Sequence, residues 1–233
     1  MSNWSVVSYL SVRELRERLA GLVGDIDPES PKGKKRLRIL QAAAELFTVQ
    51  SYRKTNIDEI AKAAGVAKGT VYLYFANKAE VLLAVIAYEK QRSLPLIEQL
   101  FDTSIPPRAR LRHWVSITIR VVASSPLLAR LTEGNQELLL ALAELDPAMV
   151  ARASADHREM LADLLDEVVA PRTWSEADRA ARIAVIDALP YLAPLLRNEH
   201  IRQGMSIDRF ADVMASVVVD GMTPPDAGTE GGG

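Results

Sequence analysis

The side chains best suited to chemistry lie in one short segment, TNIDEIAKAAGVAKGTVYLYF, which is residues 55–75. Its second half, which we expect to be a helix, carries the hydrogen-bond donors Lys68, Thr70, Tyr72 and Tyr74. Ammonium and hydroxyl groups on the outer side of a helix can reach base edges or phosphates in a DNA groove. The segment therefore offers the chemistry of polyanion recognition. The same pattern also fits a solvent-exposed helical hairpin with half-buried tyrosines.

Two further residues stand at expected helix starts, where phosphates bind well. Thr55 opens the first short helix and pairs with Asp58 as a cap, and Lys78 begins the helix after Asn77. The first backbone N–H groups of a helix have no intrahelical acceptor and attract anions. We expect Thr55 and Lys78 to bind phosphates, so Lys78→Ala should weaken DNA binding on all sequences alike.

Signs of an enzyme are missing from the sequence. There is no GxSxG, P-loop, HExxH or post-strand GxGxxG motif, and no cysteine for disulfides or thiolate chemistry. His113, His157 and His200 are too far apart in sequence to indicate a local metal site, and we expect no cofactor and no metal. The remaining enzymatic alternative is an all-helical hydrolase or lyase that uses Asp187 or His157.

Charge is divided unevenly along the chain. Residues 32–90 contain 11 Lys and Arg against 5 Asp and Glu, although all 233 residues together carry a net charge of −2. A basic block in an otherwise acidic chain is typical of one polyanion-binding part joined to a part with another role. No signal peptide or membrane-spanning run is recognisable, so we expect a cytoplasmic protein with no membrane partner.

The elements that position these residues are expected to be helices only, because apolar residues recur at spacings of three and four. Two short helices meet at Gly65, with the small Ala61 at their crossing and Val66 and Val71 beneath the second helix. This is the packing of a helix-turn-helix, here at residues 57–76. Further helices are expected at residues 34–51, 77–101, 108–124, 126–132, 135–145, 147–170, 175–197 and 207–221.

A ligand pocket is harder to predict. Trp114 and Thr118 lie on one stripe of the helix 108–124, and His157 interrupts an apolar stripe further along. An aromatic wall with a few polar groups is typical of a small-molecule pocket. The pattern favours an ordinary helical core for these residues over a ligand pocket. Few charges are forced inward, which favours an apolar or amphipathic effector.

The segment LQAAAELFTVQSYRKTNIDEIAKAAGVAKGTVYLYFANKAEVLLAVI resembles the DNA-binding domain of the TetR/AcrR transcriptional regulators. The resemblance covers about 60 residues and includes the AGV turn, GTVYLYF and NKAEVL. Two positions depart from the family pattern, because Ser51 stands where glycine is usual and Ala67 where serine is usual. The resemblance implies base contacts from Ala67, Lys68 and Gly69. It implies phosphate contacts from Thr55, Thr70, Tyr72, Tyr74 and Lys78.

The resemblance also implies an organisation and a function. We expect an amino-terminal extension at 1–31, the DNA-binding domain at 32–92, a helical effector-binding and dimerisation domain at 93–222, and a disordered tail at 223–233. The protein would be a homodimer that binds double-stranded DNA at a palindromic operator and is released by a small effector, most often as a repressor. The dimer seam would use two apolar faces, namely Ile183, Ile186, Leu189 and Pro190 with Phe210, Val213, Val217 and Val218.

The extension supports an alternative within the same fold. Leu15, Leu19, Leu22 and Ile26 form a helical stripe after Ser11. This stripe can cover the protein's own core, or it can bind a protein partner that would replace the small ligand as the regulating signal. Deletion of residues 1–30 separates the two alternatives, since loss of stability favours the first.

Overall fold

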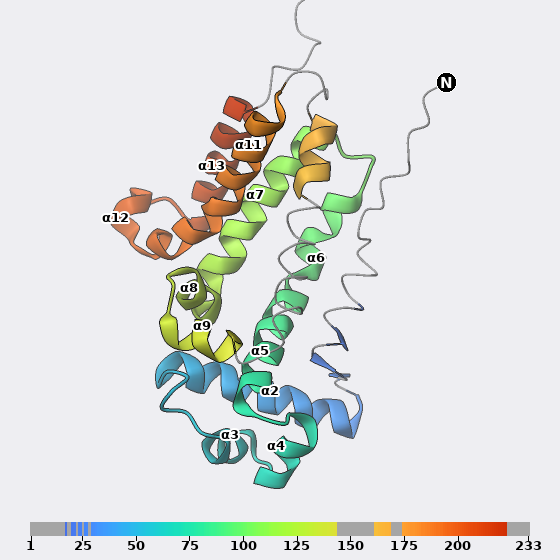
Figure 1. Ribbon diagram of the computed structural model, residues 1–233, viewed down its shortest axis with the longest axis vertical. Coiled ribbons are helices and arrows are strands. Elements are labelled where there is room, and N and C mark those ends of the chain that lie inside the picture. The colour runs from blue at the N-terminus through green and yellow to red at the C-terminus, as the bar shows by residue number, and fades with distance from the viewer. Residues whose placement is uncertain are drawn as a thin grey trace, which may run out of the picture. The chain divides into compact units, whose positions relative to one another are not determined.

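The computed structural model describes residues 17, 20, 21, 23, 24, 26, 27, 29–143, 161–168 and 174–222. All regular structure in these residues is helical, which confirms the expected all-α class (Figure 1). Contacts divide the chain into two compact units. We call them the amino-terminal unit, which comprises the described residues up to Pro95 together with 124–143, and the carboxy-terminal unit, which comprises the other described residues.

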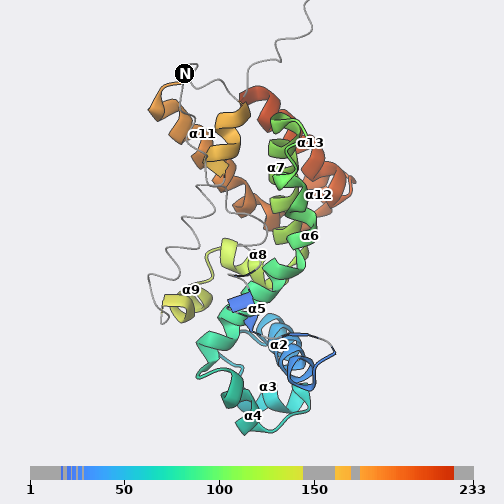
Figure 2. The same ribbon diagram turned by 90° about the vertical axis from the view of Figure 1, so that its right-hand side faces the viewer.

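The amino-terminal unit is built around helix α2 (Pro31–Val49), which packs against α3 (Ile57–Ala64) and α5 (Lys78–Arg92). Helix α4 (Lys68–Tyr74) packs in turn on α3, and Figures 1 and 2 both show α3 and α4 side by side. Their shared core consists of large apolar side chains that are almost fully buried, among them Ile39, Leu40, Phe47, Ile60, Val71 and Leu82.

The helix starts have identifiable caps, and one differs from the expected cap. Asn56, and not Thr55, is the N-cap of α3, and it forms a reciprocal capping box with Glu59. The expected pair of Thr55 and Asp58 is therefore wrong, because Asn56 offers a short side chain one residue nearer to the helix. Gly65 ends α3 with φ of 64°, as its place before the turn predicts.

Helices α8 (Pro126–Thr132) and α9 (Gln136–Ala143) also belong to the amino-terminal unit. Helix α8 packs on α2, and α9 packs on α5. The Arg130 guanidinium donates to the Phe47 carbonyl at 3.2 Å, and the Ser125 hydroxyl donates to the Glu89 carboxylate. This compact unit is thus larger than the expected DNA-binding domain at 32–92.

The extension is in contact with α2 where it is described. Val23 is fully buried, and its carbonyl accepts a hydrogen bond from the Arg36 guanidinium. Gly33 faces the backbone of Asp27 so closely that a Cβ at position 33 would lie 2.6 Å from the Asp27 nitrogen. These contacts favour a role in the protein's own core. Of the stripe expected to do this, Leu15, Leu19 and Leu22 lie outside the described residues.

The carboxy-terminal unit centres on α7 (Pro107–Ser124) and α13 (Ile207–Met222). Arg108 pairs with Asp220 at 3.2 Å, and Arg120 pairs with Asp212 at 2.6 Å, so the two helices are antiparallel. The buried Ser116 hydroxyl lies between these pairs and donates to Asp212 at 2.7 Å. Polar contacts along the helices fix their register.

The other described elements of the carboxy-terminal unit are shorter. Buried Arg110 of α7 pairs with Glu167 of the helical segment 161–168 and donates to the Leu100 carbonyl. The remaining elements are η1 (Glu98–Phe101), α11 (Glu176–Ala188), η2 (Leu189–Arg197) and α12 (Glu199–Arg202). Helix α6 (Leu94–Ile97) is divided, with its last two residues in this unit and its first two in the amino-terminal unit.

Two long helices expected from the sequence are interrupted. The helix expected at 175–197 is α-helical only to Ala188, because Pro190 and Pro194 remove backbone donors and η2 takes its place. The helix expected at 77–101 breaks at Ser93, whose hydroxyl bonds back to the Glu89 carbonyl, and α6 and η1 follow. Of the helix expected at 147–170, only 161–168 falls in the described residues.

The expected dimer seam is only partly available on the surface. Ile186 and Leu189 are buried within the carboxy-terminal unit, so they are wrong as seam residues. Val213 and Val217 are 38% and 68% exposed on α13. Other exposed apolar side chains on α11, η2 and α12 are Val185, Tyr191, Leu192, Leu195 and Ile201.

The contact between Gly33 and Asp27 predicts the sign of the stability change caused by Gly33→Ala. Gly33→Ala should lower the free energy of unfolding by about 1–3 kcal/mol in urea denaturation, because the new Cβ overlaps backbone that must move. Gly21→Ala is the matched control, since a Cβ there meets nothing within 4 Å. A neutral or stabilising Gly33→Ala, the usual result in an open helix, would show that the extension does not pack there.

Candidate nucleic-acid interface

Helix α4 has a buried side and an outward side. Val71 is its one fully buried residue, and the α3–α4 turn beneath it is closed by a hydrogen bond of 3.0 Å from the Val66 N–H to the Ala61 carbonyl. Gly69 and Leu73 each lie two residues from Val71, so they point about 160° away from it. The packing of α3 against α4 therefore presents Gly69 and Leu73 to solvent.

The expected base-contacting residues all lie at the exposed start of α4. Ala67 is the N-cap and makes no side-chain capping bond, as its departure from serine predicts. Gly69 has open space where a Cβ would be. Lys68 is exposed and pairs with Asp58 of α3 at 2.9 Å. The hydrogen bond and charge of Asp58 raise the pKa of Lys68, so the lysine stays cationic.

The expected phosphate-contacting residues divide into outward and inward groups. Tyr72 is exposed, and Thr70 and Tyr74 are half-buried. The Tyr74 hydroxyl donates to the Lys32 carbonyl at 3.3 Å, so it is anchored to the start of α2. The Arg36 guanidinium lies 5.5 Å from the centre of the Tyr74 ring. The tyrosines thus differ, because Tyr72 is directed to solvent and Tyr74 is tied to α2.

Thr55 and Lys78 point into the turn between α2 and α3. Thr55 is 1% exposed, and its hydroxyl donates to the Ser51 carbonyl at 2.8 Å. The Lys78 ammonium donates to the carbonyls of Tyr52 and Thr55 at 2.9 and 2.8 Å and lies 4.2 Å from the Tyr52 ring centre. In this arrangement both side chains bind backbone carbonyls of the turn.

The same turn contains an unusual backbone position. Ser51 has φ of 80°, in the region that glycine adopts without strain. The Glu137 carboxylate of α9 accepts hydrogen bonds from the Ser51 hydroxyl and from the Arg53 N–H. Glycine at this position is what the family pattern shows, so serine keeps the conformation and adds a hydroxyl for Glu137.

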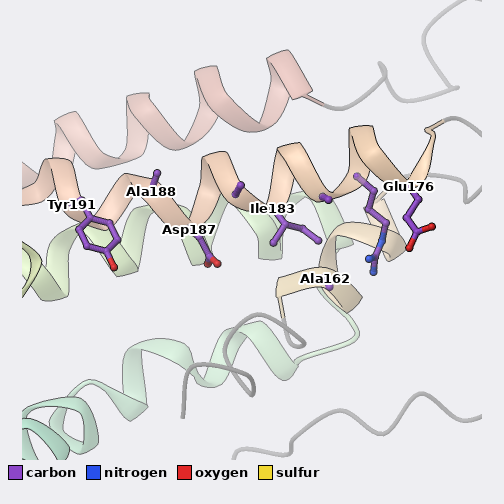
Figure 3. Close-up of a pocket in the computed structure, with 9 residues that line it drawn as sticks. Ala162, Glu176, Ile183, Asp187, Ala188 and Tyr191 are labelled. Atoms are coloured by element: carbon purple, nitrogen blue, oxygen red, sulfur yellow. The ribbon is translucent and has the colours of Figure 1, made fainter. Parts of the chain in front are cut away.

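A hollow of about 660 Å³ lies beside α11 in the carboxy-terminal unit. Figure 3 shows Glu176, Ile183 and Asp187 projecting from one side of this helix, on the side where Ala162 lies. The rest of the lining consists of the small side chains of Ala180, Ala184 and Ala188 and the larger ones of Arg179 and Tyr191. Arg179 is held by Asp166 through two hydrogen bonds of 2.6 Å.

The residues expected to bind a ligand are not brought together at this hollow. Trp114 is buried in α7, and the Thr118 hydroxyl donates to the Trp114 carbonyl at 2.8 Å. Neither lines the hollow, and His157 lies outside the described residues. From the sequence, Ile183 and Asp187 of this face were expected in other roles, and its small alanines are as common in cores as in pockets.

The geometry of α3 and α4, with an outward face of donors and a bare glycine, defines a helix-turn-helix DNA-binding protein. Residues 39–85 match the model described as bacterial regulatory proteins of the tetR family. These residues form a TetR-type DNA-binding domain, as the sequence motifs predict. The chain is a DNA-binding transcriptional regulator.

Relatives with curated descriptions agree with this assignment. The chain is 28% identical to the transcriptional activator FasR of Mycolicibacterium smegmatis over 155 residues, which are 66% of this chain and 68% of FasR. It is 29% identical over 102 residues to the fatty acid metabolism regulator protein of Bacillus subtilis, covering 44% of this chain and 53% of that protein. The second match thus spans about half of the relative's length.

Solved structures share the fold. The regulator FadR of Bacillus subtilis, crystallised in complex with stearoyl-CoA, superposes with a TM-score of 0.60. The superposition covers 79% of this chain and 98% of FadR, with 21% sequence identity. Among the described residues of our chain, no single helix is long and apolar enough to cross a membrane.

The inward placement of Lys78 predicts a loss of stability in place of a loss of phosphate binding. Lys78→Ala should lower the free energy of unfolding by about 2 kcal/mol, because it removes hydrogen bonds from a charged donor to two half-buried carbonyls. The slope of log Kd against log salt concentration should stay unchanged. A slope reduced by about 0.9 would instead identify a phosphate contact. Lys62→Ala, at an exposed lysine of α3, controls for loss of one charge.

The pair of Lys68 and Asp58 gives a second prediction. Asp58→Asn should tighten DNA binding by about two- to fivefold at low salt, because it frees Lys68 and removes a negative charge beside α4. Glu45→Gln removes an exposed charge from α2 and serves as the control. The measurement is fluorescence anisotropy with a labelled duplex. Weaker binding by Asp58→Asn would mean that Asp58 positions Lys68 productively.

Proposed function

We propose that this regulator binds a palindromic operator as a homodimer and is released by a small amphipathic ligand, with repression as the regulatory outcome. The observation that carries the proposal is the outward face of α4, where Lys68, Gly69 and Tyr72 are exposed around a buried Val71. A recognition helix with such a face enters the major groove. Two of them about 34–36 Å apart would contact successive turns of the same side of B-DNA.

Exposed apolar side chains support the dimer. Val213 and Val217 lie on successive turns of α13, and Leu192 and Leu195 are exposed on η2. Apolar surface of this kind is typical of a subunit interface. The paired charges of Arg108 and Arg120 with α13 hold this helix in register, so that Val213 and Val217 stay outward. Symmetric pairing of two such faces explains a palindromic site.

The proposed effector belongs to the fatty-acyl class. A Bacillus subtilis relative is named for fatty acid metabolism, and the Bacillus subtilis FadR structure was solved in complex with stearoyl-CoA. The sequence independently favours an apolar or amphipathic ligand, since few charges are forced inward. We propose no catalytic step and no cofactor, and we assign the protein to the cytoplasm, where its operator would lie.

A protein partner is the alternative signal. It would depend on the extension, which contacts α2 through Val23 and Asp27. Because these contacts already bury Val23 in the amino-terminal unit, the small ligand is the better supported signal.

The first experiment is selection of bound duplexes from a random-sequence pool at about 0.15 M salt, followed by sequencing. A palindrome should be enriched, and stearoyl-CoA should then release the labelled operator, raising the apparent Kd about 5- to 150-fold, the usual range of allosteric coupling. Coenzyme A and stearate, each alone, test which half of the ligand is needed. Enrichment without release by any of the three would contradict the fatty-acyl effector and leave the DNA-binding assignment intact.

A further inference from the structure

Leu73 lies on the surface of α4, where folding buries little of its apolar side chain. Its side chain is 80% exposed, and no large apolar side chain in the part of the chain that the structure describes is more exposed. Burial is the main benefit that an apolar side chain brings to stability. Leu73 therefore contributes little to holding α4 in place, and its environment must be sought outside the subunit.

Its position on α4 is at the centre of the outward face. Gly69 and Leu73 are four residues apart, so they lie on the same side of the helix, one turn from each other. A Cβ built at Gly69 would meet nothing within 4 Å. The bare backbone at Gly69 lets α4 approach a surface closely, and Leu73 then reaches into it from the next turn. Lys68 and Tyr72 flank this pair.

The chemistry of a DNA groove limits what an aliphatic side chain can read there. In the major groove the base edges present donors, acceptors and a single apolar group, the C5 methyl of thymine. Lys68 supplies a cation for acceptors or phosphates, whereas Leu73 can offer only an apolar surface. We propose that Leu73 reads the C5 methyl of one thymine in each half-site of the operator, and this rests on the proposed function.

The assignment makes Leu73 a specificity-determining residue that the polar pattern of the sequence did not reveal. Polar side chains at helical spacing attract attention as groove contacts, and a leucine in the same stretch reads as core. Exposure separates the two, since Val71 is fully buried and Leu73 is 80% exposed. The distinction needs only the direction of α4 relative to α3.

The test uses the full chain and the palindrome obtained by selection. Each thymine of a half-site is replaced in turn by deoxyuridine, which removes the methyl and keeps every hydrogen-bonding group. For the wild-type protein, one position per half-site should weaken binding about fourfold, the value of one buried methyl group. For Leu73→Ala, the same replacement should change the Kd by less than 1.5-fold, roughly three tenths of that free-energy difference.

Two further variants and one further DNA modification test whether the effect is specific to Leu73 and to thymine. Val49→Ala removes another exposed apolar side chain, 75% exposed at the end of α2, and should respond to deoxyuridine as the wild type does. Leu73→Met retains an apolar tip and should keep part of the methyl dependence. Methylation of each cytosine at C5 should leave binding unchanged, because the methyl that we assign to Leu73 belongs to thymine.

Each remaining outcome overturns the assignment. If Leu73→Ala weakens binding equally on thymine and deoxyuridine duplexes, Leu73 contacts the sugar or another protein surface. A response to methylated cytosine alone would assign the leucine to a different base. An enriched palindrome without any position sensitive to deoxyuridine rejects the role of Leu73 only. Failure to enrich any sequence rejects the proposed function as well, so the two failures are distinguishable.

Discussion

The turn between α2 and α3 is the constraint on which the DNA-binding unit depends. Its carbonyls bind the Lys78 ammonium and the Thr55 hydroxyl, and its N–H and hydroxyl groups at Arg53 and Ser51 bind Glu137. These groups come from α5, from the turn itself and from α9. Buried polar groups are costly unless they are paired, so the full set of partners must be present together. The turn thereby joins helices that are distant in sequence.

The outward face of α4 follows from this internal pairing. Because Tyr74 is anchored to the Lys32 carbonyl and Lys78 to the turn, their polar atoms hold α4 and α5 in place. What remains outward is a mixed surface of Lys68, Gly69 and Leu73. The charge on such a surface contributes to affinity for DNA. Its shape and its apolar contact contribute to discrimination between base sequences. The polar residues of a recognition helix are thus not all available to DNA, and geometry decides which are.

Much of the fold could be predicted from the sequence, because its signals are local. The short helix α8 begins at Pro126 with Ser125 as its N-cap, and Gly65 is the C-cap of α3; both lie where capping rules place them. The capping signal failed at Thr55, where two adjacent polar residues compete and the Thr55 hydroxyl bonds back to the Ser51 carbonyl. The two prolines of η2 indicated a break in the helix, but the apolar periodicity across them favoured one long helix.

The candidate site was less predictable from the sequence, because the direction in which a side chain points depends on tertiary packing. Lys78 at the start of a helix has the same local pattern whether it binds a phosphate or the carbonyl of Tyr52. Leu73 likewise reads as core until Val71 is known to fill that place. No spacing rule links Glu137 to Ser51 across 86 residues. The pairing of these residues at the shared turn is therefore visible only in the folded structure.

The inclusion of α8 and α9 in the amino-terminal unit bears on how a ligand signal reaches DNA. A ligand shifts an equilibrium only by its difference in affinity for two states, and the coupling must pass through contacts that differ between those states. Glu137 and Arg130 bind the turn and the end of α2 directly. A displacement of α9 would therefore break the hydrogen bond from Ser51 to Glu137, and Ser51 holds a left-handed backbone that favours glycine. The turn between α2 and α3 is thus the described contact through which such a displacement would reach the DNA-binding helices.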